Sequence, residues 1–409
     1  MSLQMRWVGE DDLDRVAQAR MFCYAPSTKD LPRYADGIRA DRRAAPGDFL
    51  LAKQDGLPVG TATSHSFSMW IRGGRVPCQG VGYVGTLKTH RRGSRSAGGG
   101  VASRIMRETL RKAREREEVV SALMPFRGSF YEHFGYGFVE RRCTWTLPLS
   151  TLPTGEFDGI GFYRAEDAQA LAACRQRIVE TGQCNIERSP AGWDWFMRSA
   201  EDGLLVVDRA ASGTIRGYLA FQHLHQNGTD TVKLTESGYA DLEGLRRQLH
   251  FLASLRDQYS FATLTLPADL PLNWLLRERQ IPHRLVNHAV PEVRPFVRMQ
   301  LRVLDHRRLI ESMHLPIECR GKAAVAVQEA EGDVSRFTID ISDGRASVRP
   351  TGDDGGFACP ASVWPAVITG DLPATQAMRL GLATVDDPGT AKLLDVFAQG
   401  PVPFCSEYF

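Results

Sequence analysis

Hydrophobic and polar positions in the first 150 residues switch between strand-like and helix-like patterns. Strands are predicted over residues 3–8, 48–53, 59–71, 76–87, 119–123 and 137–147. Helices are predicted over residues 11–23 and 101–118, with a helical turn at 129–134. This order predicts helices packed on a sheet.

Two further segments follow. Residues 148–161 lack periodicity and are rich in Pro, Thr, Ser and Gly, which indicates a boundary. The next segment has predicted helices at 165–180 and 242–256 and strands at 204–208, 218–223 and 261–266. After a transition at 291–295, a strand (297–303), a helix (305–313), a hairpin (335–342 and 345–350) and helices (361–367 and 375–382) are predicted. We expect an α+β protein with domains at 1–150, 151–292 and 293–409, and the shared element order of the first two would suit a duplicated fold.

Composition narrows the class of protein. Fifty Lys and Arg against 48 Asp and Glu leave a net charge of +2, which argues against nucleic acid or an anionic membrane as the main partner. The chain has neither an apolar run of the length that a membrane span needs nor an apolar N-terminal leader. Eight dispersed cysteines without a C-x-x-C pair favour reduced thiols in a cytoplasm. His223 and His225 lack a Cys or carboxylate at ligand spacing, so no metal is predicted.

One glycine motif matches a nucleotide-binding pattern by letters alone. Gly80-Val-Gly82-Tyr-Val-Gly85 reads G-x-G-x-x-G. The dinucleotide interpretation requires a helix next, whereas the residues after Gly85 continue a strand. We expect these glycines to mark a bulge or a close backbone approach.

A second glycine-rich segment, residues 89–106, lies between a predicted strand and a long helix. Glycines allow successive backbone N–H groups to converge on a phosphate, and the helix N-terminus adds partial positive charge. Arg91, Arg92 and Arg95 add full charges. The segment predicts a pyrophosphate site, and the alternative is a flexible basic surface loop.

This strand, Arg-Arg, loop and helix resemble the acetyl-coenzyme A (acetyl-CoA) motif of GNAT N-acetyltransferases, Arg/Gln-x-x-Gly-x-Gly/Ala. Arg95-Ser-Ala-Gly98-Gly-Gly100 fits one register, and Gly100-Val-Ala102 fits a shifted one that has Ala97 at the arginine position. The resemblance implies acetyl-CoA as co-substrate. Backbone groups of Val84 and Thr86 would pair with its pantetheine arm, and a backbone N–H, that of Val84, would stabilise the oxyanion. The remaining predicted cofactor contacts, centred on the pyrophosphate, are Arg91, Arg92, Arg95, Gly98, Gly100 and Ala102.

A tyrosine segment follows the predicted loop, helix and strand. Ser129-Phe-Tyr131-Glu-His-Phe-Gly-Tyr-Gly137 is similar to the Tyr-x-x-Phe-Gly-Phe/Tyr segment of many GNAT enzymes. There the tyrosine protonates the leaving thiolate, and a phenol has a suitable pKa for that task. The resemblance makes Tyr131 the candidate general acid, and the alternative role is a core aromatic.

The whole chain resembles the Eis (enhanced intracellular survival) family of acetyltransferases. The similarity lies in the early Arg-Met-Phe-Cys-Tyr helix end, the Tyr131 motif and the terminus Pro403-Phe-Cys-Ser-Glu-Tyr-Phe409. It implies two tandem GNAT domains, a sterol-carrier-protein-like C-terminal domain and a hexamer. It also implies that the α-carboxylate of Phe409 enters the first domain's active site as base. The second domain has no Arg-x-x-Gly-x-Gly loop in residues 239–249, so we expect it to have lost coenzyme A binding.

The predicted function is transfer of acetyl to a primary amine, which the resemblance places among aminoglycosides, polyamines and lysine side chains. Glu407 and Asp30 are candidate contacts for the ammonium group. The alternative is a non-catalytic lipid- or coenzyme A-binding protein with a degenerate GNAT domain.

Overall fold

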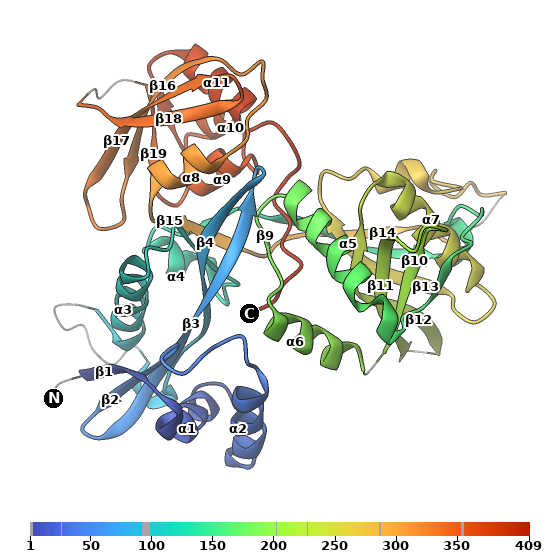
Figure 1. Ribbon diagram of the computed structural model, residues 1–409, viewed down its shortest axis with the longest axis horizontal. Helices are drawn as coiled ribbons and strands as arrows, with labels where there is room; N and C mark the ends of the chain where they lie inside the picture. Colours follow the sequence, from blue (N-terminus) through green and yellow to red (C-terminus); the bar gives the residue numbers. More distant parts are fainter. Residues whose placement is uncertain are drawn as a thin grey trace.

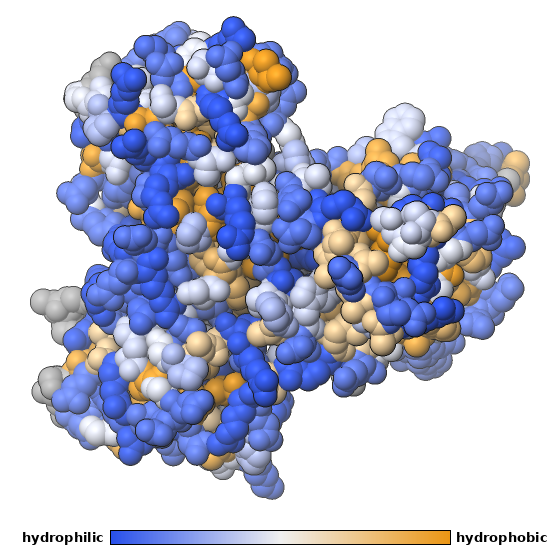
Figure 2. Space-filling model, viewed as in Figure 1, coloured by the Kyte–Doolittle hydropathy of each residue, from blue (hydrophilic) through white to orange (hydrophobic). Residues whose placement is uncertain are grey.

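The computed structural model describes residues 3–25, 27–91, 99–201, 203–226, 228–285, 288–352 and 356–409. Within these ranges the strands form three sheets, which give the three lobes of Figure 1. Figure 2 shows a mainly hydrophilic surface, with hydrophobic residues gathered where the lobes meet. No helix in the described ranges is long and apolar enough to cross a membrane.

The first sheet has the order β1-β2-β3-β4-β5-β15-β6, with the short strand β9 paired to β3. In β2, Phe49 and Leu51 pack with α1, whereas Leu50 and Ala52 pack with α3. Side chains of a strand alternate between faces, so this fully apolar run shows that helices cover both faces of the sheet. The elements are β1 (Leu3–Val8), α1 (Leu13–Tyr24), α2 (Leu31–Ala40), β2 (Phe49–Gln54), β3 (Leu57–Ile71), β4 (Gly74–Thr86), α3 (Val101–Glu115), β5 (Val120–Leu123), α4 (Gly128–Glu132), β6 (Gly137–Phe138), β9 (Asn185–Ile186) and β15 (Gln300–Val303).

The second sheet has the order β14-β7-β13-β12-β11-β10-β8. Val206 of β10 joins the core that contains α7 residues, whereas its neighbours Leu205 and Val207 join the core that contains α5 and α6 residues. The two-faced packing of the first sheet is therefore repeated. The elements are β7 (Arg141–Pro148), β8 (Ile160–Phe162), α5 (Ala168–Thr181), α6 (Pro190–Ala200), β10 (Leu204–Arg209), β11 (Ile215–Gln226), β12 (Thr229–Tyr239), α7 (Leu242–Ser254), β13 (Phe261–Pro267) and β14 (Glu292–Val297).

The third sheet has the order β18-β17-β16-β19-β20. Its core is continuous with that of the first sheet, because one cluster joins Cys78 of β4, Leu301 of β15, Val325 of β16 and the terminal Phe409. The elements are α8 (His306–Ser312), β16 (Gly321–Gln328), β17 (Val334–Ser342), β18 (Arg345–Pro350), β19 (Phe357–Pro360), α9 (Trp364–Thr369), α10 (Ala374–Arg379), β20 (Thr384–Val385) and α11 (Pro388–Phe397).

Two segments cross between the first and second sheets. The strand predicted over 137–147 is split: β6 lies in the first sheet and β7 in the second. The strand predicted over 297–303 is likewise split, with β14 paired to β7 and β15 paired to β5. The crossing points are Val139-Glu140 and Arg298-Met299. Strand β7, which precedes the expected boundary at 150, therefore belongs to the second sheet. Strand β15, which follows the expected boundary at 292, belongs to the first sheet.

Several elements are absent from the sequence prediction. Helix α2 has a glycine inside, which lowers helix propensity. Strand β12 is largely polar and lacks a clear hydrophobic alternation, and β16 begins Gly-Lys-Ala-Ala, which has none of the β-branched or aromatic residues typical of strands. Helices α6 and α11 also went unpredicted, although each begins with Pro at its first turn after a capping Ser or Asp.

Candidate active site

A cavity of about 950 Å³ lies where β4, the N-terminus of α3 and the α4 region meet. Val84 and Thr86 of β4 line one side, and Arg91, Gly100 and Ala102 line another. These five predicted cofactor residues are thus brought together around one space. Arg92, Arg95 and Gly98 lie outside the described residues.

At this cavity, strand β4 extends beyond its neighbour β5. It pairs in parallel with β5 from Cys78 to Val81, and β5 then ends. Two residues later β4 contains a bulge: Tyr83 and Val84 stand opposite Ala62 alone, and Tyr83 has φ of 51°. The predicted bulge within the G-x-G-x-x-G letters is confirmed. Beyond β5, this edge of β4 has no strand partner among the described residues, so its backbone can pair with an extended ligand.

The N-terminus of α3 is open to a ligand. Its N-cap residue is Gly100, which has no side chain, and no other side chain of the described residues caps it. Arg91 stands close by, donating from Nε to the Thr86 carbonyl at 3.2 Å and from Nη2 to the Cys23 carbonyl at 3.2 Å. A helix N-terminus with free N–H groups beside a guanidinium group attracts a phosphate. These residues fit the pyrophosphate of coenzyme A.

Tyr131 of α4 is only 4% exposed and is surrounded by aromatic rings. The ring centroids of Phe130 and Phe126 lie 5.0 and 5.8 Å from that of Tyr131. Burial raises the pKa of the Tyr131 hydroxyl, and the neighbouring Tyr136 adds to the shift. Tyr131 therefore keeps its proton at neutral pH, as a general acid must before it acts.

The C-terminal residue lies against the same strand. A methyl group placed at Gly82 would be 3.5 Å from the carboxyl carbon of Phe409. The ring of Phe409 packs at 5.2 Å from that of Phe67 and at 6.4 Å from that of His65, and the residue is 7% exposed. Figure 1 shows the chain end beside β3, between the first and second sheets. The Phe409 carboxylate thus faces β4 at Gly82, two residues before Val84 of the cavity.

Two buried residues of this region, His65 and Arg20, were not singled out from the sequence. Burial lowers the pKa of His65 to about 4, so its imidazole is neutral at physiological pH. Arg20 donates to the Thr63 hydroxyl at 2.5 Å, and its guanidinium carbon lies 3.8 Å from the Tyr83 ring centroid. Burial lowers the pKa of Arg20 to about 10, which leaves it charged. Lone residues such as these have no motif spacing that would have identified them.

The structure corrects the prediction for Glu407. Its carboxylate accepts from Arg188 Nε at 2.7 Å and from Arg175 Nη2 at 3.3 Å, and it is 8% exposed. It is neutralised inside the protein and is not offered to a substrate ammonium. Asp30 is half-buried at the end of a 3-10 helix (Thr28–Asp30) that precedes α2.

Known protein families match two separate parts of the chain. Residues 4–139 match one family described as "Acetyltransferase (GNAT) domain", and residues 184–303 match a second family with the same description. An uncharacterized N-acetyltransferase of Streptomyces avermitilis is 24% identical over 422 aligned residues, covering 92% of this chain and 93% of the relative.

Solved structures share the fold over the full length. A GCN5-related N-acetyltransferase from Anabaena variabilis has a TM-score of 0.84 at 16% identity, and Eis1 from Mycobacterium abscessus has 0.79 at 19%, with each comparison covering 100% of both chains. The chain contains two GNAT acetyltransferase domains in a mixed α/β architecture, and it is an acyltransferase of the GNAT type.

Proposed function

We propose that the chain transfers acetyl from acetyl-CoA to a primary amine by direct attack in the first GNAT domain. The observation that carries the proposal is the position of the Phe409 carboxylate against β4 at Gly82, beside the cavity lined by Val84 and Thr86. A buried Tyr131 borders the same region through its contacts with Phe126 and Phe130, which line the cavity.

Each residue has a defined task in this proposal. Backbone groups of Val84 and Thr86 hold the pantetheine arm, and the Val84 N–H stabilises charge on the thioester oxygen. The uncapped α3 N-terminus and Arg91 hold the pyrophosphate. As the amine nitrogen bonds to the acetyl carbon and the carbon–sulfur bond breaks, the Phe409 carboxylate takes or steers the amine proton. Tyr131 gives its proton to the departing thiolate.

The substrate proposed is a small-molecule amine, such as an aminoglycoside or polyamine, or a lysine side chain. Support comes from the carboxylate at Phe409 and from the partly exposed ring of Tyr24, which lines the cavity. A negative charge beside aromatic faces favours a cationic ligand.

The domain bounds, the fold of the third unit, the cellular location and the assembly are proposals as well. The units remain 1–150, 151–292 and 293–409, with β7 of the first unit in the second sheet and β15 of the third unit in the first sheet. The third is proposed to be sterol-carrier-protein-like on the order of its elements. Eight free thiols support a cytoplasmic location. A homo-oligomer, a hexamer by resemblance, is proposed for the assembly.

The test is thiol release from acetyl-CoA with a panel of amines. Tyr131→Phe should lower kcat by about 10²- to 10⁴-fold with little change in KM, because it removes only the proton donor. Tyr259→Phe, which removes a phenol from the second domain, is the matched control and should leave kcat unchanged.

Two outcomes would contradict the proposal. An unchanged kcat in Tyr131→Phe would remove Tyr131 from the acid role. The absence of turnover with every amine, together with no calorimetric binding of acetyl-CoA, would favour the non-catalytic alternative.

A further inference from the structure

In the second GNAT sheet, as in the first, two neighbouring parallel strands separate part-way along their length. Strands β12 and β13 pair in parallel only from Thr231 to Lys233. The register of β12 against β11 then shifts so that Thr235 is bulged out, as Tyr83 and Val84 are in β4. Beyond this bulge β12 leaves β13, as β4 leaves β5 in the first domain. The second domain therefore retains the cleft in which a GNAT fold places its cofactor arm.

The chain's own C-terminal tail lies along this cleft. A cavity of about 110 Å³ between β12 and β13 is lined by Glu236, Thr265, Phe404 and Ser406 among others. A second cavity, of about 270 Å³, extends toward the start of α7 and includes Pro401, Phe404 and Ser406 in its walls. Tail residues thus form one wall of each of these two cavities.

Backbone hydrogen bonds specify the path of the tail. The Phe404 N–H donates to the Gln183 carbonyl at 2.9 Å, and the Ser406 N–H donates to Asn185 Oδ1 at 3.2 Å. The Cys405 N–H donates to Glu140 Oε1 at 2.6 Å. Two arginines also donate hydrogen bonds to backbone carbonyls of the tail. Arg142 donates to the Cys405 carbonyl, and Arg43 Nη1 donates to the Tyr408 carbonyl at 2.6 Å. A tail held at so many backbone groups has one defined position.

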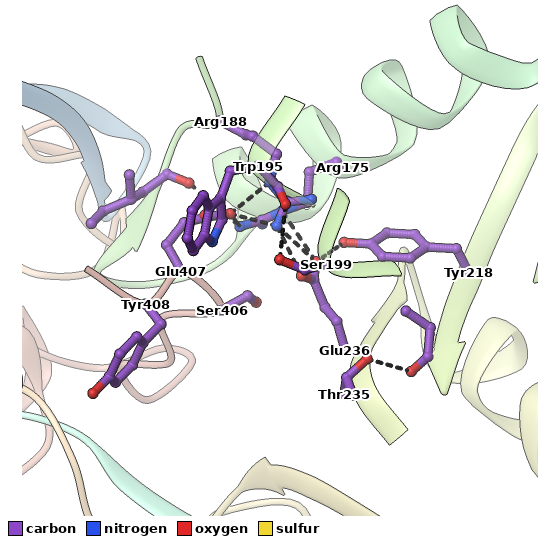
Figure 3. Close-up of polar contacts among 12 residues, drawn as sticks. Arg175, Arg188, Trp195, Ser199, Tyr218, Thr235, Glu236, Ser406, Glu407 and Tyr408 are labelled. Atoms are coloured by element: carbon purple, nitrogen blue, oxygen red, sulfur yellow. Dashed lines mark hydrogen bonds and ion pairs between the residues drawn. The ribbon is translucent and has the colours of Figure 1, made fainter. Parts of the chain in front are cut away.

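A buried ionic cluster fixes the residue two positions before the chain end (Figure 3). Arg188 donates to Glu407 at 2.7 Å and to Glu236 of β12 at 2.8 Å, and Arg175 of α5 lies 3.3 Å from Glu407. Burial opposes the charge on Arg188, but Glu236 and Glu407 outweigh it and hold its pKa above the ordinary value. Tyr218 donates its hydroxyl hydrogen to Glu236. Removing one partner leaves an uncompensated buried charge, so each group depends on the others.

The start of α7 does not suit a pyrophosphate. Only Ala240 and Asp241 separate β12 from α7, whereas residues 87–100 separate β4 from α3. Asp241 caps α7 by accepting from the Gly244 N–H at 2.8 Å, which places a carboxylate where the first domain has an uncapped end. A negative charge at this end repels an anion.

We propose that the cofactor cleft of the second GNAT domain has become the receptor for the chain's own C-terminal tail. Arg188 is its positioning residue. By holding Glu407 it sets the Phe409 carboxylate against β4. The role of the carboxylate in turnover rests on the proposed function, whereas the docking of the tail does not.

The experiment is carboxypeptidase digestion of the full-length protein, followed by intact mass. Loss of Phe409 from the wild type should be slow, because the residue is buried. Arg188→Met should release it at least about tenfold faster, since proteolysis follows the population of the opened tail. Arg209→Met, which breaks the Arg209–Asp167 ion pair in the same domain, is the matched control and should keep the wild-type rate. Arg188→Lys should restore part of the protection.

The activity arm separates positioning from general damage. Arg188→Met should lower kcat at least about tenfold while leaving the KM for acetyl-CoA unchanged, because only the tail moves. Calorimetry on the wild type should find one acetyl-CoA per chain. If Arg188→Met does not fold, Glu407→Gln, which keeps the shape and removes the charge, should give the same faster tail release.

The proposal is overturned if the tail of a folded Arg188→Met or Glu407→Gln variant is as resistant as that of the wild type. Binding of two acetyl-CoA molecules per chain would overturn it as well, because the second cleft would then be free. Digestion needs no turnover. Failure of the proposed transferase activity is therefore distinguishable from failure of tail docking.

Discussion

The protonation states of single buried polar residues in this protein are set by their surroundings. His65 is 2% exposed. Burial lowers its pKa and favours the neutral form, Asp41 and a hydrogen bond with the Arg43 backbone act in the opposite direction, and the charges of Arg43 and Arg20 reinforce the shift. Because the imidazole packs beside Phe409, its protonation state bears on the site as well as on stability.

The first prediction concerns this histidine and pH. The pKa of His65 is about 4 in the folded protein against 6.5 as its ordinary value. The unfolded chain therefore binds a proton more readily, and stability is lost as pH falls through 6.5 toward 4. Between about pH 7.5 and about pH 5 this histidine should cost roughly 2 kcal/mol of unfolding free energy.

Urea unfolding of the wild type and His65→Gln at both pH values measures the effect. The variant should lose less stability on acidification, whatever its stability at neutral pH. Glu118, whose pKa burial raises to about 7, acts in the opposite sense but is common to both proteins and cancels. Equal losses in the two proteins would show that His65 does not titrate as described.

At the scale of elements, β4 combines close packing with a bulge. A Cβ at Gly80 would lie 2.3 Å from a ring carbon of Phe67 and 3.0 Å from a ring carbon of Phe409. Only glycine allows both rings to lie on the strand at that point. The bulge at Tyr83 and Val84, directly after Gly82, then places Val84 in the cavity wall. One strand thus positions both the cofactor edge and the terminal residue.

We expect Gly80→Ala to displace the Phe67 and Phe409 rings. Overpacking of this kind should cost roughly 1–3 kcal/mol of stability and should lower kcat. Gly37→Ala, in α2, is the control. Its Cβ would meet nothing within 4 Å, and alanine should raise stability by about 0.5–1 kcal/mol. Thermal unfolding and thiol-release rates check both variants, and a Gly80→Ala protein that matches the wild type in both would contradict the packing argument.

At the scale of the whole molecule, the three sheets are coupled in two ways. Strands β7 and β15 each complete a sheet on the far side of a domain boundary, and the core of the third sheet continues through β15 into the first. The C-terminal tail then passes from the third unit along the second to reach β4 of the first (Figure 1). The proposed catalytic centre therefore depends on all three units.

Addition of one glycine after Phe409 tests this dependence. The terminal carboxylate would shift by about 3.8 Å, one residue along the chain. A misplacement of this size should lower kcat by roughly 10²-fold or more. The same glycine added at the N-terminus is the control, and acetyl-CoA affinity should be unchanged in both. Full activity of the C-terminally extended protein would refute the terminal carboxylate as base.

Local pattern was enough to determine much of this protein. The strand, glycine-rich loop and helix around Val84 to Ala102 are adjacent in sequence, so their chemistry is visible as a motif. The aromatic segment around Tyr131 is equally local. The apolar run 119–123 predicts a strand buried on both faces, and the alternating segment 261–266 predicts a strand with one fully buried face. The acyltransferase class of the chain follows from these segments.

Only the tertiary structure decided what depends on distant partners. The crossing of β7 and β15 between sheets has no local signal, because residues 137–147 and residues 297–303 each look like one continuous strand in the sequence. Glu407 resembled a substrate contact until Arg175 and Arg188, more than 200 positions away along the chain, were seen to neutralise it. Charges and close approaches between distant segments are set by three-dimensional packing. The sequence alone therefore determined the reaction class, whereas packing decided how the last residue reaches the site.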